Sequence, residues 1–279
     1  MNVQGTLMYA GSFTGRARLD TQAPANSNFV LEPHEILIRD ARPARNSYNL
    51  QEHGFEFVRH RSQAAGDPEL FEVSNTQQLL PVGPQARYSG ELIEFVREYT
   101  GAAVVLPQVG SFIARASNRS RSKTWAQTAG LVHLDYTRTS ADQFVQWTCD
   151  ALGVPVPSHS HFAFIQTWRA LSPGPQDNTL CVCDGGSVPP EDAVPIDAVM
   201  GPPDIPGKCF EFRLCRYGEG HNWYYLSNME PEDVILFKGY DSRYPRAMNA
   251  MHSAFDNPLA GPDAAPRRSI EARLLAFFE

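Results

Sequence analysis

Residues 210–214 read Phe-Glu-Phe-Arg-Leu, and this alternation of apolar and polar side chains decides the class of fold. A period of two puts Phe210, Phe212 and Leu214 on one face of a strand and the polar residues on the other, as in a half-buried antiparallel strand. Similar segments fill the second half of the chain. Strands are expected at 161–169, 179–183, 208–217, 221–227, 233–238 and 268–278. The sequence therefore predicts a mainly β protein.

The first half of the chain predicts two helices among a few strands. The first helix is expected over 89–100, with Ser89 as its N-cap and Gly101 as its stop. The second helix is expected to start at Thr139 or Ser140 and to end at residue 153. Further strands are expected at 35–40, 54–60, 102–106 and 131–135.

Helices mostly in the first half, followed by about eight strands, favour an antiparallel double-sheet jelly roll flanked by helices. For the second helix, Gln143 stands three residues after Ser140, the spacing of a capping box. The segment 184–207 is rich in proline and glycine and is expected to be a long excursion over the sheet. We expect residues 1–34 to form an N-terminal extension and residues 35–279 to form one domain.

Composition and charge exclude several classes of protein. Apolar residues make up 42% of the 279 residues, and the net charge is −7. A general binder of nucleic acid or of anionic membranes needs a basic face, which this balance disfavours. No apolar run approaches the roughly 20 residues that span a bilayer, and no signal peptide is visible. Five dispersed cysteines favour a cytoplasmic protein with reduced thiols.

Two features have open interpretations. The segment 114–124 carries Arg115, Arg119, Arg121 and Lys123 among serines. It is either a solvated loop or a lid that attracts an anionic substrate or cosubstrate. The spacings of the cysteines fit no familiar zinc site, so these residues are expected to be buried apolar packing. The chain also lacks the common signatures of nucleotide hydrolysis, dinucleotide redox chemistry, serine hydrolysis and zincin proteolysis.

The pair His133-x-Asp135 carries the strongest chemical signal. On a strand these residues point to the same face, about 6.6–7 Å apart along the chain, so they can converge on one metal ion. A facial triad of two histidines and one carboxylate binds non-haem Fe(II) and leaves positions open. His252 is the favoured third ligand, with His221 as the alternative. The sequence therefore predicts an iron site.

An Arg-x-Ser pair stands 15 residues after His252. Arg267 and Ser269 share a strand face, and together they can bind the distal carboxylate of 2-oxoglutarate. Arg273 has the same strand parity and is the alternative for this role. The order of the histidine, carboxylate and arginine motifs favours an oxygenase.

These motifs together resemble the CmcJ/NvfI/AsaB-type oxidoreductases, which are also described as cephamycin-methoxylase-related or gibberellin-desaturase-like. The resemblance covers most of the chain, from about residue 36 to the C-terminus. It rests on the segments 132–135, 168–169, 221–225, 232–242, 251–255 and 267–273.

The resemblance implies a double-stranded β-helix, cupin-like enzyme of secondary metabolism that uses Fe(II), 2-oxoglutarate and O₂, with ascorbate as a reductant in vitro. It assigns His133, Asp135 and His252 to iron, and Arg267 with Ser269 to the cosubstrate. The sequence departs from the family pattern at Ala170, Met251 and Arg268, which affects the expected shape of the pocket but not the ligands.

The predicted reaction is oxidation of a C–H bond of a small molecule by hydroxylation, desaturation, ring formation or endoperoxidation. Trp168, Arg169, Trp223 and Tyr225 are candidates for the pocket wall, although aromatic residues on strands are often core. No nucleic-acid or membrane partner is expected, and a homodimer is compatible with the sequence. The alternatives are a non-catalytic jelly-roll binding protein and a cupin-type metal enzyme that does not use 2-oxoglutarate.

Overall fold

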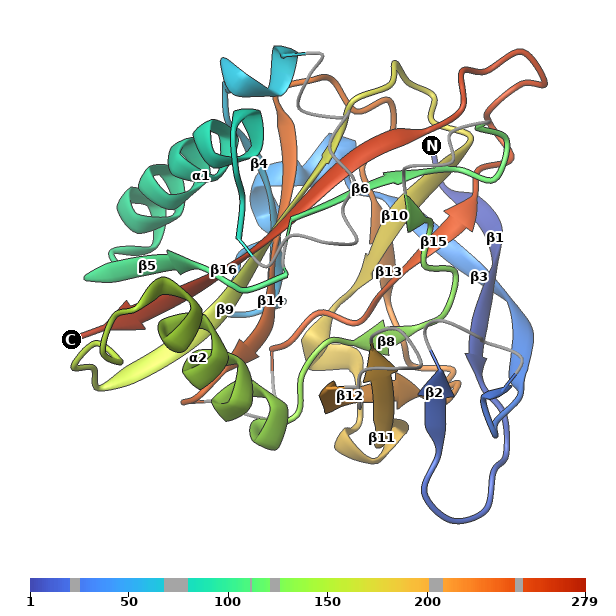
Figure 1. The fold of residues 1–279 in the computed structure, drawn as a ribbon. Helices are drawn as coiled ribbons and strands as arrows, with labels where there is room; N and C mark the ends of the chain where they lie inside the picture. Colours follow the sequence, from blue (N-terminus) through green and yellow to red (C-terminus); the bar gives the residue numbers. More distant parts are fainter. Residues whose placement is uncertain (21–25, 68–79, 111, 121–125, 201–207, 244–247) are drawn as a thin grey trace.

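The computed structural model describes residues 1–279 except 21–25, 68–79, 111, 121–125, 201–207 and 244–247. The strands of the described chain form two curled β-sheets. Figure 1 shows both α-helices on one side of the molecule, beside the smaller sheet, and β1 and β3 on the opposite side. The expected mainly β fold with flanking helices is confirmed.

The larger sheet has nine strands in the order β1-β3-β13-β10-β15-β8-β12-β11-β2. Most neighbouring strands run antiparallel, whereas β13 with β3 and β11 with β2 run parallel. The strands are β1 (Val3–Ala10), β2 (Arg18–Asp20), β3 (Leu31–Asp40), β8 (His133–Leu134), β10 (Asn178–Cys183), β11 (Ala193–Met200), β12 (Lys208–Cys215), β13 (Trp223–Tyr225) and β15 (His252–Asp256).

The smaller sheet has seven strands, six of them in the order β4-β14-β9-β16-β6-β7, with β5 also paired to β16. Its central strands are long and buried, and one of their faces borders the space between the two sheets. The strands are β4 (Phe55–Arg59), β5 (Val104–Pro107), β6 (Ile113–Ala116), β7 (Ala126–Gln127), β9 (His161–Ala170), β14 (Asp233–Asp241) and β16 (Arg268–Phe278).

The two faces of the smaller sheet bury different cores. On the outer face, α1 (Pro84–Thr100) packs through Tyr88, Leu92 and Val96. On the inner face, toward the larger sheet, Trp168 and Phe237 lie in an apolar cluster. The α2 helix (Arg138–Leu152) packs through a third cluster at one end of the sheet. Short 3₁₀ turns occupy Arg42–Ser47, Ala64–Gly66, Gly185–Ser187 and Pro190–Asp192.

The helix boundaries correct two expectations. The α1 helix begins at Pro84, before Ser89, because proline at a first helical position is already set to the helical φ. Gly101 ends it with φ 72°, as predicted. The capping box of α2 joins Thr137 and Ser140, whose side chains each accept a hydrogen bond from the other's backbone N–H. The expected box from Ser140 to Gln143 is therefore wrong by one turn.

The proline-rich segment 184–207 is not only an excursion. Its residues Ala193–Met200 form β11, which pairs along its whole length with β12. Pro195 is accommodated within this strand despite its missing N–H. The segment His252–Asp256, for which no strand was expected, forms β15.

Residues 1–34 contribute strands to the larger sheet. The β1 strand pairs antiparallel with β3, from Val3 opposite Ile38 to Ala10 opposite Leu31. The β3 strand also runs across residue 34, the expected boundary of the extension. The division of the chain at this residue stays a prediction.

Candidate metal centre

Two neighbouring strands of the larger sheet bring three side chains together. His133 lies on β8 and Asp135 follows two residues later, so both point to the same face. His252, the first residue of β15, pairs directly opposite His133. The distal histidine is therefore held by strand pairing rather than by a loop.

The donor atoms of His133, Asp135 and His252 all lie within 4.8 Å of one another. The Asp135 carboxylate oxygens are 3.8 Å from Nε2 of His133 and 3.5 Å from Nε2 of His252. The two imidazole rings have centroids 4.3 Å apart. Donors at the ordinary bond length of about 2.1 Å from one ion lie about 3 Å apart, so small adjustments bring this set onto a common ion.

The opposite nitrogen of each ring is bound to the backbone. Nδ1 of His133 lies 2.8 Å from the carbonyl oxygen of Leu131, and Nδ1 of His252 lies 3.3 Å from that of Ala250. A carbonyl accepts, so Nδ1 carries the proton and Nε2 keeps its lone pair. Burial and then the neighbouring His133 lower the pKa of His252 to about 4. The neutral form needed for metal binding therefore prevails at neutral pH.

Asp135 is held by two side chains of the smaller sheet. Gln166 on β9 donates to Oδ2 at 2.6 Å, and Arg273 on β16 donates to Oδ1 at 3.1 Å. Burial alone would favour the neutral acid, but Arg273, His252 and His133 hold the pKa of Asp135 well below its usual range. The carboxylate is thus ionised and oriented, as a metal ligand must be.

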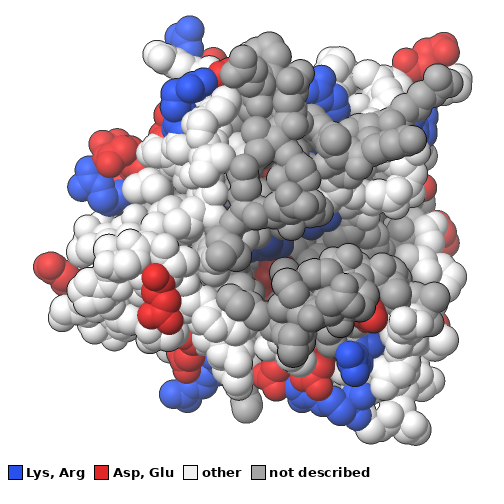
Figure 2. All heavy atoms as spheres, viewed as in Figure 1, with Lys and Arg blue, Asp and Glu red and all other residues white. Residues whose placement is uncertain are grey.

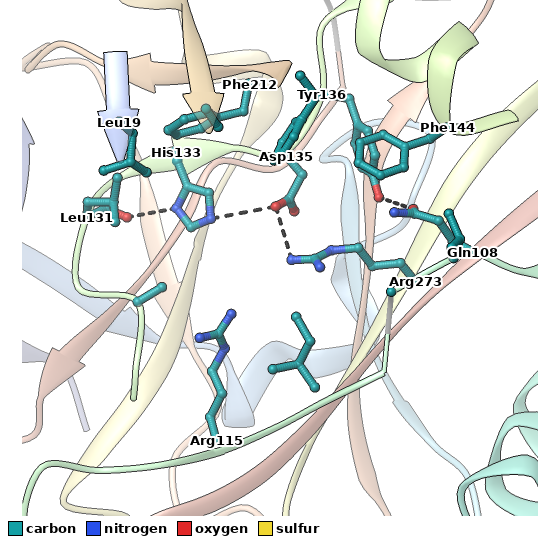
Figure 3. A pocket seen from close by; sticks show the side chains of 16 residues that line it. Leu19, Gln108, Arg115, Leu131, His133, Asp135, Tyr136, Phe144, Phe212 and Arg273 are labelled. Carbon is teal, nitrogen blue, oxygen red and sulfur yellow. Dashed lines mark hydrogen bonds and ion pairs between the residues drawn. The ribbon is translucent and has the colours of Figure 1, made fainter. Parts of the chain in front are cut away.

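Two of the three donor residues, His133 and Asp135, line a cavity of about 360 Å³ between the two sheets. Figure 3 shows His133 and Asp135 above this space, with Arg115 reaching toward it from below and Arg273 from the right. The rest of the wall is mainly apolar or aromatic. The other side chains that line the cavity include Gln108, Tyr136, Phe144, Phe210 and Phe212.

A row of polar side chains on β16 extends from this cavity. Arg267, just before the strand, shares a face with Ser269, Glu271 and Arg273 because alternate residues point the same way. Glu271 bonds Arg115 at 3.1 and 3.2 Å and Arg273 at 3.3 Å. Burial raises the pKa of Glu271, but these two arginines lower it overall. Arg115 and Arg273 are therefore both neutralised by carboxylates of the protein.

Arg267 has a different environment. It is 1% exposed, and its guanidinium donates to Asn178 and, at 3.2 Å, to the Ser269 hydroxyl. It also stacks over Trp168 at 5.1 Å. Within the described residues its guanidinium forms no ion pair, and burial, followed by the charge of Arg115, lowers its pKa to about 9. It does not line the cavity described above.

The four candidates for the pocket wall are dispersed. Trp168 faces the space between the sheets but is 1% exposed and packs in the core. Arg169 points to the opposite face of β9, where it bonds Tyr88, His60 and the carbonyl of Pro231. Trp223 and Tyr225 lie in a second core with β1 and β3. None of the four lines the cavity beside the triad.

His221, the alternative third ligand, lies away from the triad. Its Nε2 is 3.1 Å from Asp192, and its Nδ1 is 3.2 Å from the Tyr9 hydroxyl, which accepts from Trp223. These contacts explain His221 as a satisfied buried histidine. Of the basic segment 114–124, residues 121–124 lie outside the described residues, while Arg115 lies on β6 and lines the cavity.

Sequence reasoning missed Gln166. Gln166 directly follows the apolar stretch 162–165 and precedes Thr167 and Trp168. Its side chain is polar, yet the residue is only 2% exposed. A lone amide in a buried strand must find a hydrogen-bond partner, so its position was a usable signal. Phe210 and Phe212, which were predicted only as strand residues, also line the cavity.

The donor chemistry fits iron. Two imidazoles whose Nδ1 atoms are bound to backbone carbonyls and one ionised carboxylate form the facial set that binds non-haem Fe(II). His133 and Asp135 line the cavity, so an ion held by the triad would lie beside this space. The fold and this candidate iron-binding triad define a metal-dependent oxidoreductase of the double-stranded β-helix class.

Comparisons with known proteins agree with this class. A family model described as "Oxidoreductase/YMDC permease-like domain" matches residues 11–277. The Fe(II)/2-oxoglutarate-dependent dioxygenase nvfI of Aspergillus novofumigatus is 31% identical over 90% of this chain and 86% of its own. The hydroxylase/desaturase efuI of Hormonema carpetanum is 29% identical over 88% of this chain and 83% of its own.

A solved structure of the iron and alpha-ketoglutarate-dependent endoperoxidase NvfI superposes with a TM-score of 0.81 and 26% sequence identity. The match covers 99% of this chain and 97% of that chain. The chain belongs to this family of oxidoreductases. The jelly-roll fold and the resemblance to NvfI-type enzymes inferred from the motifs are both confirmed.

Proposed function

We propose that this protein is an Fe(II)/2-oxoglutarate-dependent oxygenase that oxidises a C–H bond of a secondary-metabolite intermediate. The observation that carries the proposal is the convergence of His133, Asp135 and His252 at the edge of a cavity. The names of the relatives nvfI and efuI, a dioxygenase and a hydroxylase/desaturase, support the same activity.

Each residue of the triad has a defined task in this proposal. His133 and His252 bind the iron through Nε2, and Asp135 binds it through a carboxylate oxygen. Bound iron, with 2-oxoglutarate and O₂, supplies oxidation of a C–H bond coupled to the loss of CO₂ and the formation of succinate. Gln166 and Arg273 keep Asp135 ionised and fixed, so that its carboxylate would be ready to bind the ion.

Arg267 and Ser269 are proposed to bind the distal carboxylate of 2-oxoglutarate. Arg267 is buried without an ion pair among the described residues, whereas Arg273 already bonds Asp135 and Glu271. A buried cation that lacks a carboxylate partner is stabilised most by a carboxylate ligand. This difference favours Arg267 over Arg273 for the role.

The cavity wall indicates the class of substrate. Phe144, Phe210 and Phe212 give an aromatic surface, while Gln108 and Tyr136 offer a few polar groups. Such a mixture binds a small organic molecule and orients it by a few hydrogen bonds. Hydroxylation, desaturation, ring formation and endoperoxidation all remain within the proposal, because they differ in how the oxidised substrate is held.

The face drawn in Figure 2 carries charges of both signs, which is compatible with a small molecule as the partner. In Figure 2, described Lys and Arg side chains lie beside Asp and Glu around the rim, without a continuous basic area. None of the described helices is both long and apolar enough to span a membrane. A cytoplasmic location, a homodimer and ascorbate as reductant are further parts of the proposal.

The test is an anaerobic titration of the metal-free protein with Fe(II) and then with 2-oxoglutarate. A weak visible charge-transfer band from a chelated iron and keto acid is expected in the wild type and should vanish in His252→Ala. His159→Ala is the control, because His159 is exposed and lies outside the triad. Iron binding without the band would favour a metal enzyme that does not use 2-oxoglutarate. No iron binding would favour a binding protein.

A further inference from the structure

A second cavity, of about 630 Å³, lies on the other face of the strand that carries the iron ligands. Leu134 lines it, whereas His133 and Asp135 on either side of Leu134 line the first cavity. Alternate residues of a strand face opposite sides, so the two cavities are separated by the sheet itself. The second cavity is therefore distinct from the candidate metal centre.

Arg213 on β12 lines this second cavity and is 9% exposed. It pairs in register with Leu134 and therefore shares its face. Its Nε donates to the carbonyl oxygen of Tyr136 at 2.9 Å, while its Nη2 is buried and has no hydrogen-bond partner among the described residues. A buried donor left unpaired is destabilising, and more so when the group is charged.

The charge of Arg213 is also unbalanced. Within the described part of the chain it forms no ion pair, and burial lowers its pKa. Arg169 is also buried, but four acceptor contacts occupy its guanidinium. Arg273 is buried and bonds two carboxylates. The guanidinium of Arg213 has one acceptor, the carbonyl oxygen of Tyr136, and no carboxylate among the described residues.

The surroundings of Arg213 add positive potential. The cavity is also lined by Thr137 and Arg138, the N-cap and first residue of the 15-residue helix α2. The Thr137 side chain already accepts from the N–H of Ser140, and Glu211 accepts from the Thr137 hydroxyl. The N–H groups of the first two helical residues are therefore the donors left at this helix end, where the helix dipole favours an anion. Glu191 lines the cavity as well, but it is exposed and therefore solvated.

We infer that the second cavity binds a small oxyanion, a phosphate or a carboxylate, through the Arg213 guanidinium at the N-terminus of α2. The anion supplies the acceptor that Arg213 lacks and neutralises its buried charge. Both phosphate and carboxylate groups match the planar fork of an arginine, so the chemistry is shared and the source is decided by experiment. This site does not depend on the proposed oxygenase activity.

The test uses the full metal-free chain, titrated calorimetrically with inorganic phosphate and, separately, with acetate. Wild type should bind at least one of them, and Arg213→Met should weaken that binding about tenfold or more. The variant removes an uncompensated buried charge, so it should fold. Arg97→Gln, a change at an exposed arginine of α1, is the control and should bind like wild type.

The two arms identify the ligand class. If Arg213→Met weakens the binding of phosphate but not that of acetate, the site is a phosphate site. If it weakens the binding of acetate but not that of phosphate, the site is a carboxylate site. Equal binding of both anions by wild type and Arg213→Met, or no binding by wild type, overturns the inference. As a measurement that needs no variant, anomalous diffraction from crystals soaked in tungstate, for a phosphate site, or in bromoacetate, for a carboxylate site, should place a peak within hydrogen-bond distance of Arg213. Absence of a peak in both soaks also overturns the inference.

Discussion

Nη2 of Arg273 lies 3.1 Å from Oδ1 of Asp135, so the candidate iron ligand of one sheet is fixed by a cation from the other. Arg273 also bonds Gln166, which holds the second oxygen of Asp135 at 2.6 Å. The carboxylate is thus oriented before any metal binds. Groups of this kind commonly contribute 10- to 100-fold to metal affinity.

Arg273→Gln should therefore weaken Fe(II) binding by about 10- to 100-fold. Without Arg273 the pKa of Asp135 rises, and a proton competes better with the metal. The deficit relative to wild type should therefore grow as the pH falls. Anaerobic Fe(II) titrations at several pH values measure this. An affinity equal to that of wild type at every pH would show that Arg273 does not support the ligand.

Gly239 lies at the irregularity in β14 between Lys238 and Tyr240. A Cβ there would lie 2.5 Å from Cε2 of Tyr136 and 2.6 Å from Nε2 of Gln166. Gly239→Ala should therefore cost about 1–3 kcal/mol of unfolding free energy. It should also weaken Fe(II) binding, because Gln166 cannot stay on Asp135.

The control for this change is Gly90→Ala in α1, where nothing lies within 4 Å of the added carbon. It should stabilise the protein by about 0.5–1 kcal/mol and leave iron affinity unchanged. Denaturant unfolding and Fe(II) titration on both variants supply the comparison. A Gly239→Ala protein with wild-type stability and affinity would contradict the predicted displacement of Gln166.

The sequence predicted the triad better than it predicted the pocket. His133 and Asp135 are linked by local strand geometry, and the strand period alone puts them on one face. His252 was found from its order relative to Arg267. Pocket residues depend on which face of a strand turns inward, and this depends on sheet pairing that no local pattern specifies. Trp223, for example, was a candidate for the pocket wall but packs in the second apolar core.

Long-range pairing also explains the missed elements. The β11 strand was not expected from the sequence, because Pro195 and the prolines around it are typical of a loop. In the structure β12 pairs antiparallel with the whole strand. The β1 strand has weak apolar periodicity, but pairing with β3 orders it. Tertiary pairing overrides weak local propensity in both cases.

The variant Arg169→Met tests whether this buried arginine of β9 stabilises the fold or lines the pocket. Arg169 donates to Tyr88 Oη at 3.1 Å and to the carbonyl of His60 at 3.0 Å, between α1 and the outer face of the smaller sheet. Arg169→Met leaves these acceptors unpaired, so it should cost about 3 kcal/mol or more in unfolding free energy. Iron affinity and the KM for 2-oxoglutarate of the folded fraction should not change. A raised KM with unchanged stability would instead put Arg169 in the pocket.

Arg267 tests the assignment of the cosubstrate. Its guanidinium contacts Ser269 and Asn178 but no carboxylate of the described residues. Arg267→Gln should raise the KM for 2-oxoglutarate by about 10- to 100-fold, because it removes a charge-assisted interaction. Fe(II) affinity should stay near that of wild type, since Arg267 does not touch the triad. Ser269→Ala should have a smaller effect of the same kind.

Arg267→Gln and Arg273→Gln together separate the two arginines. The first should affect mainly the KM for 2-oxoglutarate, and the second mainly the affinity for Fe(II), because only Arg273 contacts Asp135. Succinate formation assayed over a range of 2-oxoglutarate and Fe(II) concentrations measures both quantities. If Arg273→Gln raises the KM while Arg267→Gln does not, Arg273 binds the cosubstrate. If neither changes the KM and iron still binds, the protein is a metal enzyme that does not use 2-oxoglutarate.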